Sequence, residues 1–112
     1  EVLWSRGIAE GVFEKLSMEY ILELSSAAKR DLKRLPNGIQ REILFTHLPA
    51  IQSDPNGVGF PLRGTLKGER SYHFGRKPEY RIIYFVEDEL ITVTIIGSRE
   101  NIYKRAKRHH RK

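Results

Sequence analysis

Three runs of β-branched and aromatic residues in the second half of the chain predict strands. They cover residues 70–74, 80–86 and 90–96. The acidic turn at 87–89 is short, so the second and third runs are expected to pair as an antiparallel hairpin. Because side chains alternate along a strand, Arg81 shares one face with Ile83 and Phe85. A guanidinium among apolar side chains is costly to desolvate unless an anion meets it, so Arg81 is the first candidate functional residue.

An earlier strand and two helices are predicted before these runs. Residues 19–24 alternate well enough for a first strand, and Ser25 or Ser26 is a suitable N-cap for the helix that follows. The apolar stripe of that helix consists of Ala28, Leu32 and Leu35. Residues 36–38, Pro-Asn-Gly, end it, and the short break predicts that a second helix folds back as an antiparallel hairpin.

Two residues of the second helix are informative. His47 lies on its apolar side and is interpreted as a packing histidine rather than a ligand. Pro49 is expected to kink or end the helix, because its ring clashes with the preceding turn, with continuation through Ala50 and Ile51 for a final turn as the alternative. Residues 52–68 are dense in Gly and Pro and predict a loop.

The predicted fold is α+β with the order β-α-α-β-β-β, in which an antiparallel sheet packs against the helical hairpin. A short basic helix is expected from about Arg99. The length of 112 residues fits one domain, which we assign to 18–112, and 1–17 form an extension that is either native or the product of an upstream start. Hydrophobic residues make up 39% and charged residues 30%, which is typical of a globular protein.

Several classes of protein are not expected from this composition. The chain has no cysteine, so neither disulfides nor a thiolate metal site is expected. No apolar run approaches the roughly 20 residues that cross a bilayer, and the start of the chain does not resemble a signal peptide. The sequence therefore predicts a cytoplasmic protein without a membrane partner.

The formal net charge of +6 lies wholly at the C-terminal end. Residues 99–112 hold seven Lys and Arg against one Glu, whereas the preceding 98 residues hold 13 basic and 13 acidic residues. Such a segregated basic end is typical of a protein that binds phosphate or an acidic protein. A solvated tail that aids solubility is the alternative interpretation.

The order of elements and several segments together resemble the RelE/ParE superfamily of bacterial and archaeal toxins. The segments are LSSAAKRDLKRL, PLRGTLKGERSYHF and YRIIYFVEDELITVTIIGSRENIY. Within them, Tyr80-Arg81-x-x-Tyr84, an acidic turn, an apolar strand and Gly97-x-Arg99-x-x-x-Tyr103 form the most specific combination. The resemblance extends from Met18 to about Arg108.

This resemblance implies a toxin of a type II toxin-antitoxin system, a class linked to stress response, with a RelB-like antitoxin as its partner. In the RelE-like branch, which we favour, the toxin enters the ribosomal A site and cleaves mRNA, which inhibits translation. In the ParE-like branch the same fold inhibits DNA gyrase and has no nuclease site. An RNA-binding module without chemistry is the third hypothesis, and none of the three requires a cofactor or a metal.

A ribonuclease of this kind uses the 2′-hydroxyl of its substrate as the nucleophile, so it needs a base, an acid and cations for the phosphorane. Arg81 and Arg99 suit the cationic role, because a guanidinium offers two parallel donors and stays charged. The resemblance implies that Tyr103 transfers the proton, although its usual pKa of about 10 requires nearby cations to favour the phenolate. Tyr103 instead stacks on a base or packs in the alternative interpretations.

His73 is the second candidate for proton transfer, because the usual pKa of histidine is about 6.5. The alternative is that His73 only forms a hydrogen bond across the hairpin. Further cations are expected to bind the RNA, namely Arg70, Lys104, Arg105, Lys107 and Arg108. The antitoxin is expected to fold along the helical hairpin and the sheet edge, and to cover Arg81 or displace the helix that bears Tyr103.

Overall fold

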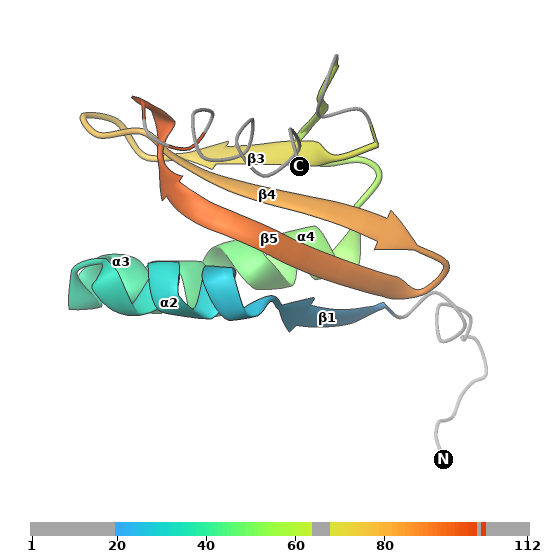
Figure 1. Ribbon diagram of the computed structural model, residues 1–112, viewed down its shortest axis with the longest axis horizontal. Coiled ribbons are helices and arrows are strands. Elements are labelled where there is room, and N and C mark those ends of the chain that lie inside the picture. Colours follow the sequence, from blue (N-terminus) through green and yellow to red (C-terminus); the bar gives the residue numbers. More distant parts are fainter. Residues whose placement is uncertain (1–19, 64–67, 101, 103–112) are drawn as a thin grey trace.

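A five-stranded sheet with helices on one of its faces forms the described part of the chain, which comprises residues 20–63, 68–100 and 102 of this computed structural model (Figure 1). The strands are β1 (Ile21–Leu24), β2 (Phe60–Pro61), β3 (Arg70–Phe74), β4 (Tyr80–Glu87) and β5 (Leu90–Ser98). The helices are α2 (Ser26–Arg34), α3 (Asn37–Glu42) and α4 (Leu48–Ser53), with a π-helical turn, η2 (Ile43–His47), between the last two. The predicted α+β fold and its order of elements are confirmed.

The sheet has the strand order β1-β5-β4-β3-β2. Strands β2 to β5 pair antiparallel with one another, as the short turn at 87–89 predicts for β4 and β5. Strand β1 pairs parallel with β5, which differs from the predicted antiparallel sheet. No tight turn joins β1 to its neighbour, so no local signal fixes its direction. Strand β2 lies inside the predicted loop, because two residues are too few for a periodic pattern and Pro61 is typical of an edge strand.

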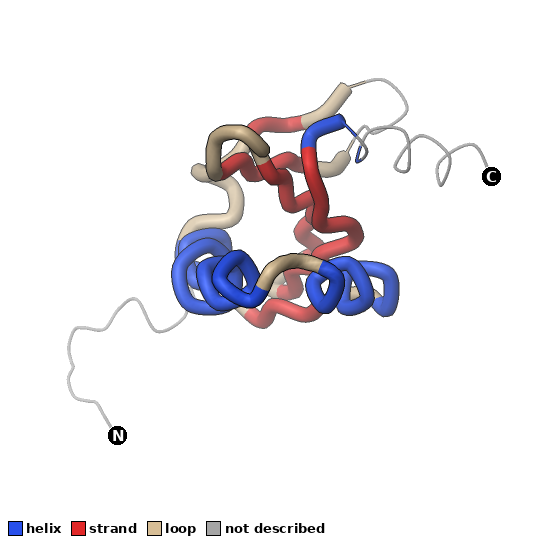
Figure 2. Tube along the Cα trace, turned by 90° about the vertical axis from the view of Figure 1, so that its left-hand side faces the viewer, coloured by secondary structure: helices blue, strands red, loops and turns tan. Residues whose placement is uncertain are grey.

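Serine and glutamine side chains position the helical hairpin on the sheet. The Ser25 hydroxyl oxygen accepts the Ala28 N–H at 3.1 Å and lies 3.0 Å from the Thr94 carbonyl oxygen, so the N-cap of α2 is also attached to β5. At the other end of α2, the Gln40 amide donates to the Leu35 carbonyl oxygen at 2.8 Å. Figure 2 shows the two helical segments side by side, as the hairpin prediction requires.

Pro49 does not end the second helix, contrary to one of the expected outcomes. The helix continues from α3 through η2 into α4, which reaches Ser53. In the π-helical turn, the Leu48 N–H donates to the Ile43 carbonyl oxygen, five residues back. Pro49 follows this turn in the first positions of α4, where a proline is tolerated because its missing N–H needs no helical partner.

Both faces of the sheet are covered at its centre. The larger core lies between the sheet and the helices and includes Leu32, Ile43, Ile51, Ile82, Tyr84, Val93 and Ile96. On the opposite face a smaller cluster joins Ile83, Ile95 and Ile102, with Leu62 packed against it. A bulge between Ile83 and Tyr84 shifts the pairing with β5, and the Thr94 hydroxyl donates to the Ile83 carbonyl oxygen at 3.2 Å.

Parts of the predicted organisation lie outside the described residues. These parts are the domain start at Met18, the extension 1–17 and most of the basic C-terminal helix, of which Arg99, Glu100 and Ile102 are described and helical. The domain boundary and that helix therefore stay predictions. Among residues 20–63, 68–100 and 102, no helix combines the length and apolar character that a membrane span requires.

Tyr84 provides a test of the larger core. Its side chain is fully buried, and its hydroxyl lies 2.7 Å from the Pro55 carbonyl oxygen and 3.1 Å from that of Val58. We expect Tyr84→Phe to lower the free energy of unfolding by about 1–2 kcal/mol, because the Pro55 carbonyl loses this donor. Urea denaturation measures the change, with Tyr80→Phe, a half-buried residue on the same face of β4, as the control. Equal effects of the two variants would contradict this account.

Candidate functional site

A cluster of polar and charged side chains lies on the sheet face opposite the helices. Its members are Ser71 and His73 of β3, Glu79 before β4, Arg81 of β4 and Arg99 after β5. His73 is directly opposite Arg81 in the β3–β4 register, and the Arg99 N–H donates to the Glu79 carbonyl oxygen at 3.0 Å. Side chains two residues apart in a strand share a face, so Ser71 lies beside His73 and Glu79 beside Arg81. The β3–β4 register and the Arg99–Glu79 backbone bond bring these groups together.

Glu79 is the anion that the desolvated Arg81 requires. Its Oε2 accepts a hydrogen bond from Arg81 Nε at 3.2 Å and forms an ion pair with the same guanidinium, 3.1 Å from Arg81 Nη2. The Arg81 side chain is only 12% exposed, whereas that of Glu79 is 32% exposed. The guanidinium is therefore held within the sheet surface, and the carboxylate approaches it from the solvent side.

His73 contacts both Ser71 and Glu79. Its Nε2 lies 3.0 Å from the Ser71 hydroxyl oxygen, and its Nδ1 lies 3.4 Å from Glu79 Oε2. Ser71 is fully buried, so its hydroxyl is not accessible as a nucleophile. A neutral ring that accepts a hydrogen bond from the Ser71 hydroxyl at Nε2 and presents Nδ1–H to Glu79 would satisfy all three groups.

The surroundings of His73 lower its pKa. Burial has the largest effect and the Arg81 guanidinium adds to it, whereas the Glu79 carboxylate raises the pKa in part and Arg99 lowers it. The imidazole is consequently neutral at pH 7, the state that can accept a proton. The question left open by the sequence, acid/base group or hydrogen-bonding residue, stays a prediction, because both roles fit this geometry.

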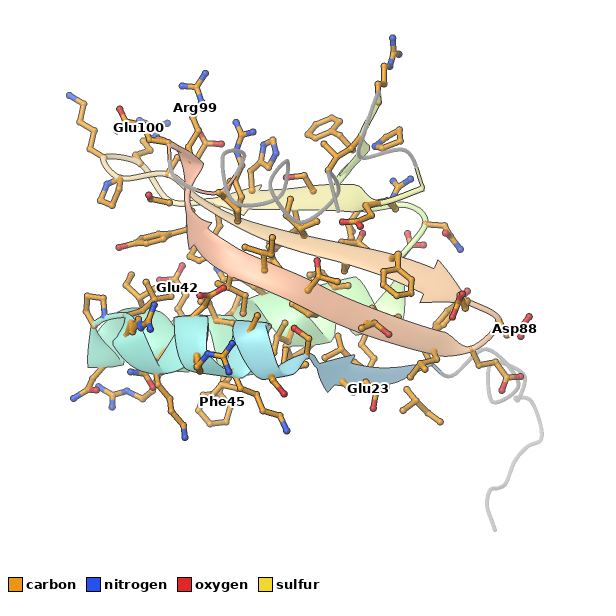
Figure 3. The ribbon with its side chains drawn as sticks, in the orientation of Figure 1. Glu23, Glu42, Phe45, Asp88, Arg99 and Glu100 are labelled. Carbon is orange, nitrogen blue, oxygen red and sulfur yellow. The ribbon has the colours of Figure 1, made fainter. Side chains whose placement is uncertain are left out.

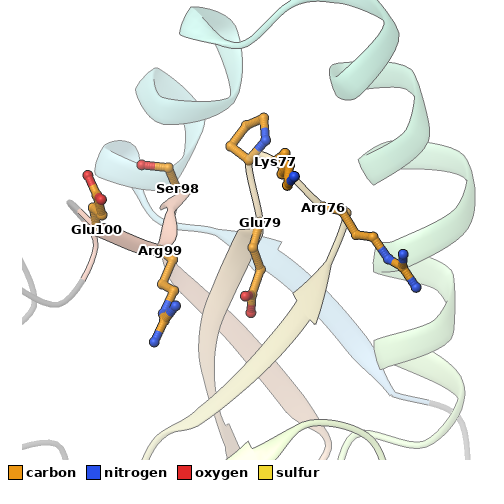
Figure 4. Close-up of a pocket in the computed structure, with 8 residues that line it drawn as sticks. Arg76, Lys77, Glu79, Ser98, Arg99 and Glu100 are labelled. Atoms are coloured by element: carbon orange, nitrogen blue, oxygen red, sulfur yellow. The ribbon is translucent and has the colours of Figure 1, made fainter.

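A pocket of about 670 Å³ adjoins the cluster beyond Glu79 and Arg99. It is lined by Gly75, Arg76, Lys77, Pro78, Glu79, Ser98, Arg99 and Glu100. Figure 4 shows the side chains of Glu79 and Arg99 pointing to the same side of the sheet, whereas Arg76 points away from them. Arg99 is exposed, so this pocket gives the cluster an open, cationic border.

Other predicted site residues lie elsewhere. Arg70 is on the helix-facing side of β3, where its Nη2 donates to the Val58 carbonyl oxygen at 2.9 Å and its Nε approaches the same oxygen at 3.3 Å. This placement separates Arg70 from Arg81 and gives it a structural role in holding the loop before β2. The remaining candidates lie outside the described residues, namely Tyr103, Lys104, Arg105, Lys107 and Arg108.

The prediction that His47 is a packing residue is confirmed. It is buried between the second helix and the sheet, and its ring stacks on Phe74 with centroids 4.1 Å apart. Its Nδ1 lies 2.8 Å from the Tyr72 hydroxyl oxygen, and its Nε2 lies 2.9 Å from Glu42 Oε2. His47 therefore connects helix and sheet on the face away from Arg81.

Sequence reasoning missed two residues of the site. Glu79 could have been found, because it stands two residues before Arg81 and a desolvated guanidinium calls for an anion on its own face. Phe60 could not have been found, because no pattern in the sequence predicts the two-residue strand β2 that carries it. Its ring centroid is 5.5 Å from that of His73, and the residue is 63% exposed. Within the described ranges, no group of three or more His, Asp or Glu side chains is arranged to hold a metal ion.

Comparisons with known proteins agree on one group of toxins. The family described as "ParE toxin of type II toxin-antitoxin system, parDE" matches residues 22–103. Toxin RelG of Mycobacterium tuberculosis is 34% identical over 90 residues, which are 79% of this chain and 100% of the relative. Toxin RelE of the same organism is 32% identical over 77 residues, or 69% of this chain and 76% of the relative.

Solved structures give the same fold. The toxin-antitoxin complex RelBE2 from M. tuberculosis contains a chain that is 28% identical, with a TM-score of 0.65 and coverage of 72% of this chain and 99% of that chain. A mutant of E. coli toxin RelE in the free state is 23% identical, with a TM-score of 0.66 and coverage of 82% and 98%. A chain of the ParDE system from P. aeruginosa is 17% identical, with a TM-score of 0.54 and coverage of 72% and 97%. The last two likenesses concern the fold alone.

The electrostatics of the site predict how His73 titrates. Its pKa should lie below about 6.5, the value expected in the unfolded chain. At a pH between the lowered pKa of the folded protein and the pKa of the unfolded chain, the unfolded chain binds more protons than the folded protein does. The free energy of unfolding should therefore rise with pH across this range. Arg81→Gln should raise the pKa of His73, because it removes a cation that disfavours the imidazolium.

The measurement is an NMR titration of the imidazole resonances, assigned with a His73→Asn variant. Arg41→Gln, which removes an exposed cation from α3, is the matched control and should leave the His73 pKa in place. A pKa of His73 above 6.5, or one that Arg81→Gln leaves unchanged, would contradict this description of the site.

Proposed function

Because the chain belongs to the RelE/ParE superfamily of type II toxin-antitoxin toxins, we propose that it is a ribosome-dependent endoribonuclease that cleaves mRNA in the ribosomal A site. The observation that supports this proposal is the pairing of Arg81 and His73 across β3 and β4. It sets a guanidinium that is only 12% exposed beside an imidazole with a lowered pKa, a cation and a proton-transfer group of the kinds that phosphodiester cleavage uses. Messenger RNA and ribosomes would be the partners, in the cytoplasm.

The proposed reaction is an attack by the 2′-hydroxyl of the RNA on the adjacent phosphorus. A base removes the hydroxyl proton, the P–O bond to the 5′-oxygen breaks, and an acid protonates that oxygen, so a 2′,3′-cyclic phosphate and a 5′-hydroxyl end result. Arg81 would donate two parallel N–H groups to the non-bridging oxygens, and Arg99 would add a second cation at the border of the site. These guanidinium groups supply the positive charge without a metal ion.

His73 and Tyr103 are the two candidates for the proton transfers. The lowered pKa of His73 keeps the imidazole neutral at pH 7, which favours it as the base. Tyr103 matches the tyrosine to which the superfamily resemblance assigns proton transfer. The exposed ring of Phe60, close to His73, offers a surface on which a nucleotide base can stack.

A second candidate function is inhibition of DNA gyrase. The observation in its favour is the family description itself, which names ParE. A gyrase inhibitor binds its target without cleaving a phosphodiester and needs neither a mostly desolvated guanidinium nor a neutral imidazole beside it. The Arg81–His73 pair therefore favours the nuclease.

The activity test is cleavage of mRNA on ribosomes by enzyme treated with EDTA, with magnesium supplied only to keep the ribosomes intact. We expect cuts within translated frames, mapped as new 5′ ends. Arg81→Ala should reduce the rate by roughly 100- to 1000-fold, or about 3–4 kcal/mol, by analogy with the loss of one oxyanion-hole donor. Arg41→Ala, on the helical layer, should retain the wild-type rate.

The same assay separates the competing roles. Tyr103→Phe and His73→Gln should each slow cleavage if both residues move protons, whereas an unchanged rate in one of them assigns the transfer to the other. Gyrase-dependent DNA breaks with intact mRNA would show that the second candidate function is correct and the nuclease proposal is wrong.

We also propose an antitoxin as the protein partner, since M. tuberculosis RelBE2 is a toxin-antitoxin complex. Two apolar side chains of η2, Leu44 and Phe45, are 42% and 74% exposed, and Ile21 on edge strand β1 is 64% exposed. Figure 3 shows Phe45 on the outer side of the helical layer, away from the sheet. These residues lie on the helical hairpin and the sheet edge, where the sequence predicts that the antitoxin folds.

Phe45→Glu tests this surface. Loss of a large apolar anchor from an interface typically costs about 2 kcal/mol or more, so the affinity for the antitoxin encoded beside the toxin should fall at least about 30-fold. Ser53→Glu adds the same charge at the exposed end of α4 and should have little effect. Isothermal titration calorimetry measures both, and equal losses for the two variants would show that added charge rather than the apolar surface controls binding.

A further inference from the structure

One carboxylate oxygen in the site is contacted by two different side chains. Glu79 Oε2 lies 3.2 Å from Arg81 Nε, 3.1 Å from Arg81 Nη2 and 3.4 Å from His73 Nδ1. Two guanidinium nitrogens and one imidazole nitrogen therefore converge on a single carboxylate oxygen. This is the donor pattern that also binds a non-bridging oxygen of a phosphate group.

We propose that Glu79 occupies the phosphate position in the free protein and that a phosphodiester of the RNA displaces it when it binds. The identity of the ligand as RNA rests on the proposed function, whereas the anion site itself rests on Arg81, His73 and Glu79 alone. Glu79 then acts as an internal competitor of the substrate.

The geometry makes Glu79 the group that moves. Its backbone is fixed, because its carbonyl oxygen accepts the Arg99 N–H at 3.0 Å, but its side chain is 32% exposed and adjoins an open pocket. Arg81 is 12% exposed and lies on β4, the middle strand of the sheet. Rotation of the Glu79 side chain toward the pocket therefore vacates the site while the strands and the guanidinium stay in place.

The chemistry favours replacement by phosphate. Glu79 offers Arg81 one oxygen, Oε2, whereas a phosphodiester presents two charged oxygens to two parallel N–H groups of a guanidinium. Arg99 points to the same side of the sheet as Glu79 (Figure 4) and can approach the same anion. Until that anion arrives, the carboxylate compensates the cost of keeping the guanidinium away from water.

Glu79→Gln distinguishes an internal competitor from a residue that only holds Arg81 in position. An internal competitor predicts tighter anion binding in the variant, by roughly fivefold if the lost ion pair is worth about 1 kcal/mol. A residue that only positions Arg81 predicts weaker binding, because the guanidinium loses its orientation. The probes are inorganic phosphate and a tetradeoxynucleotide, which lacks the 2′-hydroxyls needed for cleavage, and binding is followed by NMR at fixed ionic strength.

The matched control is Glu87→Gln, which removes the same charge from the far end of β4. Figure 3 shows the neighbouring residue Asp88 at the end of the sheet opposite Arg99. Affinity for phosphate should change less than about twofold in this variant, because solvent ions screen the distant charge. An equal gain in both glutamine variants would attribute the effect to net charge and overturn the proposal.

A measurement on the wild-type protein keeps the test independent of how the variant folds. Saturating phosphate should shift the Glu79 side-chain carboxyl carbon resonance and leave that of Glu87 unchanged. Bound phosphate that leaves the Glu79 resonance in place would overturn the proposal.

The outcome is separable from that of the nuclease assay. If Glu79→Gln binds phosphate more tightly but the wild-type protein does not cleave mRNA, Glu79 is an internal competitor and the nuclease proposal is wrong. If the wild-type protein cleaves mRNA but Glu79→Gln leaves phosphate binding unchanged or weakens it, the nuclease proposal holds and Glu79 is not an internal competitor.

Discussion

The candidate site depends on the charge balance around a guanidinium held within a sheet. Arg81 is 12% exposed on β4, so its positive charge requires a nearby anion in every state of the protein. Glu79 supplies that anion and at the same time contacts His73. The charge of Arg81 and the pKa of His73 are therefore coupled through one carboxylate, because Glu79 compensates the guanidinium and also raises the pKa of the imidazole.

The two faces of the sheet have different roles. On one face, α2 is attached to β5 by its cap at Ser25 and by the buried Asp31, whose Oδ2 accepts the Ile96 N–H at 3.0 Å. The other face carries a small apolar cluster beside the polar one formed around Arg81. Concentrating the larger core under the helices leaves the opposite face open enough for Glu79, His73 and Arg99 to meet solvent.

Two arginines on adjacent strands lie on opposite faces of the sheet, because side chains alternate along a strand. Arg70 lies on the helix-facing side of β3, and its guanidinium is bonded to backbone carbonyl oxygens of Val58 and Gly59. Arg81 lies on the other side and is bonded to a carboxylate that solvent reaches. Carbonyl oxygens of a loop are neutral and fixed, whereas a partly exposed carboxylate can be exchanged for another anion, so the proposed anion site is at Arg81 and not at Arg70.

The sequence by itself determined the elements and the key cation. Periodicity predicted β3, β4, β5 and the helical hairpin, and an Arg among apolar strand residues identified Arg81, because these signals are local. Tertiary structure decided what local patterns do not encode. It set the parallel direction of β1, let the helix continue past Pro49 through a π-helical turn, and brought Glu79 to Arg81 and His73. Each of these outcomes depends on strand register and on packing between segments distant in sequence, and the net free energy of those contacts is fixed only when the whole domain is assembled.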